Sequence, residues 1–346
     1  MSAPDPVSSR PVVSVVVPAR NEEASLGACL ESLVSQTGVL FEVVVVDDGS
    51  TDRTREIAQL FPAVRVLEAP PLKAGWIGKN NAVDAGARAA HGRWLLFTDA
   101  DTVHLPGSLS RSVTEAEQQK AALLSYSPEQ DVRGILEKAV MPVIFAELAA
   151  AYRPSQVSHP RSPAAAANGQ YLLVSREAYD SVGGHAAVAG DLLEDVALAR
   201  KVKKSGRKIF FRFGGDAVRT RMYRSFSQLR EGWTKNLKLL FPSSVQLAVT
   251  RTLEFVLIVG SAALTVVSLV ERRWMVAAAS AAVALALYGF LLKRIRRAHF
   301  SWDANALAIL GLPLFSYLLL RSALSYKRGR VNWKGREYEA KDLAVL

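Results

Sequence analysis

The sequence predicts an α/β fold with a mostly parallel sheet, followed by C-terminal transmembrane helices. Between residues 12 and 98, runs of β-branched apolar residues alternate with helically spaced apolar residues. Such alternation is typical of a parallel sheet that helices cover on both faces. After Arg251 the pattern changes to long apolar stretches that are almost free of charge. We therefore expect a globular domain at 11–245 and a membrane region at 250–326.

The first domain begins with four expected strands and three expected helices. Each strand is a short apolar run, and the first is closed by Pro18. Each helix has apolar residues at helical spacing, and Ser50 or Thr51 is the expected cap of the second. The strands are expected at 12–17, 41–46, 64–67 and 93–98, and the helices at 21–36, 51–60 and 78–90.

Three C-terminal stretches are candidate membrane spans, at 253–270, 274–292 and 305–321. The first contains one charge, Glu254, and the second contains none. Both approach the roughly 20 residues that cross a bilayer. The third is shorter and contains a glycine and a proline, so it either spans or re-enters. Buried core helices are the alternative for all three.

The charge distribution favours a membrane rather than nucleic acid as the partner. The formal net charge is +11, and its basic residues cluster beside the apolar stretches. Basic clusters in these places fit anionic lipid headgroups and the cytoplasmic side of a membrane. The clusters are Lys293, Arg294, Arg296 and Arg297, and then Lys327, Arg328, Arg330, Lys334 and Arg336 in a basic tail at 327–346.

The N-terminal residues and the single cysteine indicate a cytoplasmic catalytic domain. Segment 1–10 has no apolar core of a signal peptide, and we expect a disordered lead-in. Cys29 is the only cysteine, so the chain forms no internal disulfide and suits a reducing compartment. We expect a multi-pass protein of the cell membrane.

Polar clusters follow three of the expected strands, at 18–22, 47–50 and 98–101. In parallel sheets, ligands bind at the carboxyl ends of the strands. The clusters bring five acidic residues to one edge, where they repel each other unless a cation joins them. We expect a ligand site there.

Asp99 and Asp101 are the candidate metal ligands. In an extended chain, side chains two residues apart point to the same side. Two converging carboxylates suit Mg²⁺ or Mn²⁺, which often bridge to substrate phosphates. The alternative is a plain turn, in which one aspartate caps the next helix near Pro106.

Three blocks occur in order: VSVVVPARNEEASLGACLESLVSQ, FEVVVVDDGSTDRT and WLLFTDAD. Together they resemble the family-2 glycosyltransferases, nucleotide-sugar enzymes with the GT-A fold, over roughly residues 12–240. The resemblance implies a nucleotide pocket, a uracil contact and a metal motif under the diphosphate. By this resemblance the nucleotide pocket is lined by Pro18, Arg20 and Glu22. The uracil contact is made by Asp48, and the metal motif consists of Asp99 and Asp101. Whether Asp99 binds metal or ribose stays open.

The stretch GWIGKNNA contains Lys79 near an expected helix start, after Gly75 and Gly78, which allow close backbone approach. A lysine together with helix N–H groups makes an anion site. The alternative is an exposed lysine in a loop. The form of this stretch is similar to the lipid-directed branch of the family, which includes ceramide glucosyltransferases and hopanoid- or carotenoid-associated enzymes.

The stretch GDLLEDVALARKVKKSG places Glu194 and Asp195 at a helix start. Carboxylates are favoured there in any case, which is the alternative explanation. The family resemblance implies that Asp195 is the base that accepts the proton of the acceptor hydroxyl. It also implies that Glu194 supports the acceptor site and that the reaction inverts the anomeric centre.

The acceptor or diphosphate side is assigned to Gly169, Gln170, Arg230 and Trp233. Relatives often carry Gln/Arg-x-x-Arg-Trp, but Gly232 replaces the arginine here, with Arg230 as the candidate substitute. This departure disfavours processive polymer synthesis. Trp233 is alternatively an interfacial anchor.

An apolar stretch at 133–152 carries Glu137, Lys138 and Glu147, which disfavours a full span. We expect a helix at the membrane surface, with a buried amphipathic helix as the alternative. His185 has no partner at metal-ligand spacing and is not expected to bind metal.

The combined hypothesis is a metal-dependent inverting glycosyltransferase, which transfers a sugar from a nucleotide diphosphate sugar, a UDP-sugar by the resemblance, to a membrane lipid. The alternatives are a polysaccharide synthase and a non-catalytic nucleotide-sugar-binding protein. Three crossings place the basic tail opposite the catalytic domain, against the positive-inside rule. The sequence names neither the sugar nor the lipid.

Overall fold

The computed structural model describes residues 10–339, which form two compact units. Within these residues, the first unit comprises 10–131 and 152–222, and the second comprises 132–151 and 223–339. The predicted disordered lead-in, up to residue 9, and the end of the basic tail lie outside the described residues.

The first unit contains a seven-stranded sheet in the order β3-β2-β1-β4-β8-β6-β9. The first four strands are mutually parallel, and β8 runs antiparallel to both of its neighbours. The mostly parallel sheet is therefore confirmed. Its strands are β1 (Val13–Ala19), β2 (Phe41–Asp47), β3 (Val64–Glu68), β4 (Trp94–Phe97), β6 (Leu123–Ser127), β8 (Leu172–Ser175) and β9 (Ile209–Phe213).

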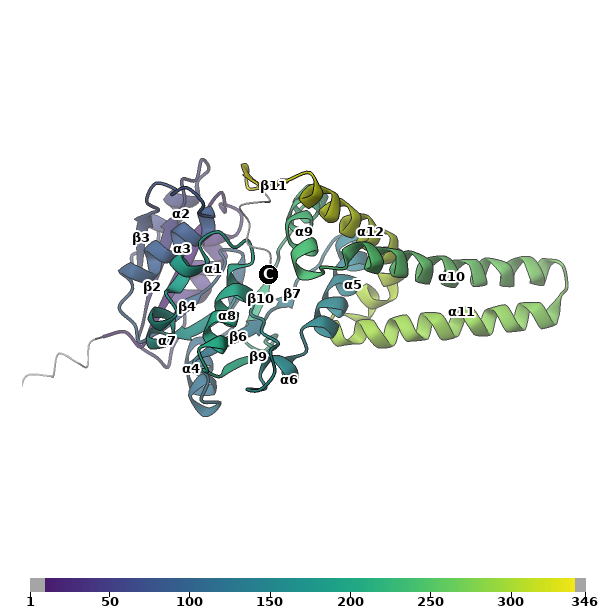
Figure 1. The fold of residues 1–346 in the computed structure, drawn as a ribbon, viewed down its shortest axis with the longest axis horizontal. Helices are drawn as coiled ribbons and strands as arrows, with labels where there is room; N and C mark the ends of the chain where they lie inside the picture. The colour runs from purple at the N-terminus through teal and green to yellow at the C-terminus, as the bar shows by residue number, and fades with distance from the viewer. Residues whose placement is uncertain (1–9, 340–346) are drawn as a thin grey trace, which may run out of the picture. The chain divides into compact units, whose positions relative to one another are not determined.

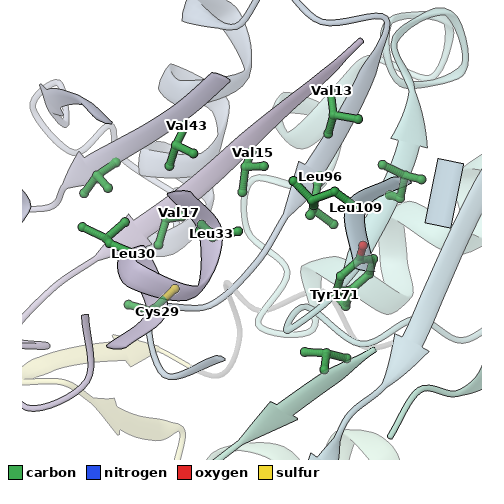
Figure 2. Packing of buried hydrophobic residues seen from close by; sticks show 14 of the residues in the cluster. Val13, Val15, Val17, Cys29, Leu30, Leu33, Val43, Leu96, Leu109 and Tyr171 are labelled. Atoms are coloured by element: carbon green, nitrogen blue, oxygen red, sulfur yellow. The ribbon is translucent and has the colours of Figure 1, made fainter. Parts of the chain in front are cut away.

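Helices cover both faces of this sheet (Figure 1). Val13, Val15 and Val17 pack on one face, shown in Figure 2, and Val16 packs on the other. Successive strand residues alternate between the two covered faces, which explains why every β1 residue except the buried Ser14 is apolar. The first face carries α1 (Leu26–Val34), α2 (Thr54–Gln59) and α4 (Ser108–Gln118); the second carries α3 (Gly78–Ala89), α7 (Arg176–Ser181) and α8 (Glu194–Lys204).

The ends of several elements differ from the sequence prediction. The strand β1 continues past Pro18 to Ala19, because its pairing with β4 stops at Val16 and no partner there needs the missing N–H. The helix α1 begins at Leu26 rather than residue 21. Asn21 has a φ of 53°, so the chain turns before the helix starts.

The predicted cap of α2 is wrong. This helix begins at Thr54, and no side chain caps it. Ser50 and Thr51 are instead part of the preceding turn: the backbone N–H of Ser50 donates to Asp47, and that of Thr51 donates to Asn21. The polar loop is therefore held by bonds between two strand ends.

Smaller elements of the first unit surround the main sheet. A three-stranded sheet has the order β5-β10-β7. The remaining segments are β5 (Thr102–His104), β7 (Glu129–Gln130), β10 (Val218–Thr220), α6 (Pro154–Val157) and η2 (Gly184–Val188).

The second unit is mainly helical, and three of its helices are long and apolar enough to cross a membrane. These are α10 (Ser244–Val270), α11 (Trp274–Ile295), which continues into η3 (Arg296–Ala298), and α12 (Trp302–Lys327). The others are α5 (Ile135–Ala151), α9 (Phe226–Leu240), β11 (Arg330–Trp333) and β12 (Arg336–Glu339). The helix α5 packs along α12, and a surface position for it stays a prediction.

Candidate active site

The first two polar strand ends are tied together. The Arg20 guanidinium donates to the backbone carbonyls of Asp48 and Gly49. The backbone N–H of Glu22 donates to the Thr54 hydroxyl at 2.7 Å. Asp48 is buried, and its N–H bonds the carbonyl of Ala19. The structure thus brings the predicted nucleotide-binding residues of these two loops together, and their contact with a nucleotide stays a prediction.

Asp99 and Asp101 lie in a turn, so the argument from an extended chain is wrong. The Thr102 N–H donates to the Asp99 carbonyl at 3.2 Å, which closes the turn before β5. The capping alternative is also wrong, because α4 begins at Ser108 without a side-chain cap.

The Asp99 and Asp101 carboxylates both act electrostatically on the buried Cys29 thiol. Burial first, and then the charges of Asp101 and Asp99, raise the pKa of the Cys29 thiol. Carboxylate oxygens are hard donors of the kind that Mg²⁺ and Mn²⁺ take. Within residues 10–339 no group of three His, Cys, Asp or Glu side chains is placed to hold a metal ion. Asp99 and Asp101 therefore supply the right kind of donor atoms, and their role as metal ligands stays a prediction.

Lys79 joins the metal motif to the predicted catalytic pair. Its ammonium lies 2.7 Å from Asp99 Oδ1 and 2.8 Å from Glu194 Oε1. Burial disfavours its charged form, but Asp99 and the two acids of α8 outweigh this and raise the pKa of Lys79. Lys79 lies in the first turn of α3 and is only 27% exposed, so the exposed-loop alternative is wrong.

Asp195 is held in one orientation by two backbone donors. Its Oδ2 accepts from the Gly169 N–H and its Oδ1 from the Val196 N–H, both at 2.8 Å. Burial and the neighbouring Glu194 charge raise the pKa of Asp195 to about 6. A fixed carboxylate that titrates near neutral pH is suited to general-base catalysis.

A pocket collects many of the predicted residues around this cluster. Its walls come from β1, α3, β4, β8 and α8. The predicted residues that line it are Pro18, Lys79, Asp99, Gly169, Glu194 and Asp195; the structure adds Val83, Phe97, Thr98, Leu172 and His185.

His185 was not expected at the site, although it lines this pocket. Its Nδ1 lies 3.0 Å from the Tyr179 hydroxyl, and its ring packs edge-on against Phe97. Burial lowers the pKa of His185 to about 4, so the ring is neutral at pH 7. Because no sequence spacing marks such a partner, only the fold reveals His185.

Gln170 is buried and belongs to a network beneath the metal motif. Its Nε2 donates to the Thr220 hydroxyl at 3.0 Å, and that hydroxyl donates to the Asp101 carbonyl at 3.2 Å. The Thr98 hydroxyl donates to the Gln170 carbonyl at 2.7 Å. Gln170 is therefore linked through Thr220 to the Asp99–Asp101 turn and supports its position. A contact between Gln170 and the acceptor stays a prediction.

Asn80 is a site residue that the sequence analysis missed. It is fully buried, and its Nδ2 lies 2.9–3.0 Å from the carbonyls of Val188, Ala189 and Asp191. These carbonyls belong to the loop that leads into α8. Asn80 thus fixes the approach to Asp195 from the residue next to Lys79. The only sequence signal for this role was the pair of asparagines that follows Lys79 in GWIGKNNA.

Arg230 and Trp233 lie on α9, in the second unit. Trp233 is 2% exposed, and its ring contacts Phe145 and Tyr223. A Cβ on Gly232 would lie 2.5 Å from the Tyr223 hydroxyl oxygen. The glycine that replaces the family's arginine therefore makes room for this tyrosine, and the tryptophan is a packed core residue of its unit.

Comparison with known proteins relates part of the chain to a glycosyltransferase family. Residues 14–180 match the model of glycosyl transferase family 2. The chain is 28% identical over 233 residues to 4,4'-diaponeurosporenoate glycosyltransferase of Staphylococcus aureus strain USA300. That alignment covers 65% of this chain and 60% of the relative, so the relative is matched over less than two thirds of its length.

A solved structure shares the fold. The mannosyltransferase PcManGT from Pyrobaculum calidifontis, solved with GDP-Man and Mn²⁺, has a TM-score of 0.52 at 19% identity. The match covers 93% of this chain and 88% of that chain. At this identity the likeness shows the fold alone. With the mostly parallel sheet, the chain has the GT-A fold, and its residues 14–180 form a region that matches glycosyl transferase family 2.

Proposed function

We propose that the protein transfers a sugar from a nucleotide diphosphate sugar to a membrane lipid, with inversion at the anomeric carbon. One observation carries the proposal: Lys79 bridges Asp99 and Glu194, with Asp195 beside them in one pocket. A diphosphate-binding group and a base are thereby held within one site.

The donor side is assigned to Lys79 and the Asp99–Asp101 turn. A diphosphate is strongly anionic, and both a lysine at a helix N-terminus and a divalent cation stabilise it. We assign the metal, Mg²⁺ or Mn²⁺, to Asp101 with Asp99; when bound, it neutralises charge on the leaving diphosphate. A relative of the same fold was solved with a nucleotide sugar and Mn²⁺, which supports this assignment.

The remaining donor contacts follow from the loops around β1 and β2. We assign the nucleotide pocket to Pro18, Arg20 and Glu22, and the base of the nucleotide to Asp48. Arg20 already links these two loops through the Asp48 carbonyl. A UDP-sugar is the proposed donor, and a GDP-sugar is the competing donor to test.

The acceptor side is assigned to Asp195. Its carboxylate accepts the proton of the acceptor hydroxyl while that oxygen attacks the anomeric carbon, and the bond from this carbon to the diphosphate oxygen breaks. The two backbone N–H bonds keep the carboxylate aligned. Glu194 supports the acceptor site and holds Lys79. A single base opposite the leaving group gives inversion.

A lipid acceptor is proposed from two observations. The second unit has three helices that are long and apolar enough to cross a membrane. The curated relative is named a 4,4'-diaponeurosporenoate glycosyltransferase, and diaponeurosporenoate is a carotenoid carboxylate. We assign Gly169 and Gln170 to the acceptor or diphosphate side, where the Gly169 N–H holds Asp195. The same role for Arg230 and Trp233 stays a prediction from the family resemblance.

The test is a donor screen on the purified full chain with membrane lipid extract and Mn²⁺. Radiolabelled UDP- and GDP-sugars are offered, and the expected result is label in a chloroform-extractable product. Label in an insoluble polymer would favour the polysaccharide synthase alternative. Nucleotide-sugar binding without transfer to any acceptor would favour the non-catalytic one.

The metal assignment has its own test. Asp101→Ala should abolish metal-stimulated transfer and weaken Mn²⁺ binding measured by calorimetry in the presence of UDP. Asp180→Ala, an exposed aspartate on α7, is the matched control and should leave both unchanged. Unaltered metal dependence in Asp101→Ala would remove Asp101 from the ligand set.

A further inference from the structure

The three apolar helices of the second unit are not equivalent. Within its most apolar window, α10 is 11% buried and α11 is 17% buried, whereas α12 is 44% buried. Apolar side chains on the first two are largely exposed, such as Val266 of α10 at 62% and Leu285 of α11 at 72%. Protein covers much of α12, so lipid has less of its surface to contact.

The helix α12 is fastened near both ends to helices of its own unit. Near its start, Asp303 pairs with Lys138 of α5 at 2.7 Å. Near its end, the Ser322 hydroxyl donates to the Thr234 carbonyl of α9 at 2.7 Å, and the Tyr326 hydroxyl donates to the Lys235 carbonyl at 2.7 Å.

The helices that hold α12 are constrained by the chain itself. Both ends of α5 continue directly into the first unit, at residues 131 and 152, so α5 begins and ends on one side of a membrane. The helix α9 also follows the first unit directly, after residue 222. Since α12 is bonded near one end to α5 and near the other to α9, both of its ends belong to that same side.

The helices α10 and α11 have a different arrangement. They run side by side as a hairpin (Figure 1), and the hydroxyls of Thr265 and Ser280 bond across it at 2.9 Å. The uncharged run 274–292 rises about 29 Å at 1.5 Å per residue. This length matches the ~30 Å hydrocarbon core of a bilayer. Charged residues follow at each end, with 271–273 at the tip and Lys293 at the base.

A balanced group of charges lies at the base of the hairpin. Arg251 contacts Glu147 at 3.0 Å and Glu254 at 2.8 Å, and Arg294 contacts the same two carboxylates at 3.3 and 2.9 Å. Two cations and two anions cancel, so the charge inside the apolar run of α10 is neutralised. The group also links the hairpin to α5.

We propose that only the α10–α11 hairpin crosses the bilayer. The tip at 271–273 then lies on the far side, and α12 remains in the base, on the side of the first unit. The basic residues between Lys327 and Arg336 lie on that same side, together with Arg296 and Arg297, as the positive-inside rule favours. This inference goes beyond the proposed function and does not depend on the donor or the acceptor.

Cysteine accessibility in whole cells tests the proposal on the full chain. The exposed residues Lys204, Arg273 and Arg330 are replaced singly by cysteine, and a membrane-impermeant maleimide is added before or after permeabilisation. The native Cys29 is fully buried, so the parent protein serves as the blank. Lys204→Cys, in the first unit, reports the side of the catalytic domain.

The expected result is that Arg330→Cys is labelled under the same condition as Lys204→Cys, and Arg273→Cys under the opposite condition. Labelling of Arg330→Cys together with Arg273→Cys would show that α12 crosses. Labelling of all three under one condition would show that the hairpin does not cross. Either outcome overturns the proposal, and neither bears on whether the protein transfers a sugar.

Discussion

The two units each contain a group of buried or half-buried charges, and the two groups differ in their balance. In the first unit, Lys79 faces three carboxylates, those of Asp99, Glu194 and Asp195. In the second unit, two arginines face two glutamates across α5, α10 and α11. Both groups join elements that are distant in sequence.

The difference in net charge suggests different roles for the two groups, one in the reaction and one in helix packing. Burial, and then the excess of negative charge from Glu194, keep the pKa of Asp195 above its ordinary value. The group of two arginines and two glutamates has no net charge, and its ion pairs link α5, α10 and α11. Unbalanced groups in a pocket are candidates for function, whereas balanced groups more often belong to structure.

The largest expected effect is on the unbalanced group. Asp195→Asn keeps the shape of the side chain but cannot accept a proton, so kcat should fall by about 10²- to 10⁴-fold. Binding of UDP, measured by calorimetry, should persist. Asp180→Asn is the control and should retain wild-type turnover. Turnover near the wild-type value in Asp195→Asn would show that another group is the base.

The next effect is on the balanced group. Arg294→Gln leaves two glutamates with one arginine, and we expect a loss of about 3 kcal/mol in unfolding free energy, followed as a drop in Tm in detergent. The double variant Glu254→Gln/Arg294→Gln restores the balance and should lose less than Arg294→Gln alone. If the two changes simply add, the group is not cooperative and the contrast between the units fails.

A smaller effect is expected where α12 packs on α5. A Cβ on Gly311 would lie 1.9 Å from the Ala139 carbonyl oxygen, so Gly311→Ala forces the helices apart. We expect a cost of about 1–3 kcal/mol, measured by thermal unfolding in detergent. Gly260→Ala on α10, where a Cβ meets no neighbour within 4 Å, should be neutral or slightly stabilising. Equal Tm values for the two variants would contradict this packing.

The smallest expected effect is a displacement of the pH profile. Asp195 must be ionised to act as a base, so kcat should be high above about pH 6 and fall as the pH drops through that value. Glu194→Gln removes a negative charge that raises the pKa of Asp195, so this acidic limb should move to lower pH. A limb that stays in place, measured with saturating donor, would mean that Asp195 does not govern it.

Much of the fold followed from local patterns in the sequence. The runs of valine in β1 and β2 are buried on both faces, and this explains why periodicity located them within two residues. Boundaries failed where side chains bond across loops, as at Ser50, Thr51 and Asn21. Such bonds replace the local caps that a sequence pattern assumes.

By itself, the sequence determined the succession of strands and helices along the chain, the acidic residues at the strand ends and the apolar C-terminal stretches. Each is a property of neighbouring residues, and local propensity and hydropathy suffice for it. Only the tertiary structure decided that Lys79 meets Glu194, that Asn80 holds the loop before α8, and that α12 is fastened to α5 and α9. These contacts join residues 91 to 165 positions apart, and folding rather than sequence spacing sets the distance between them.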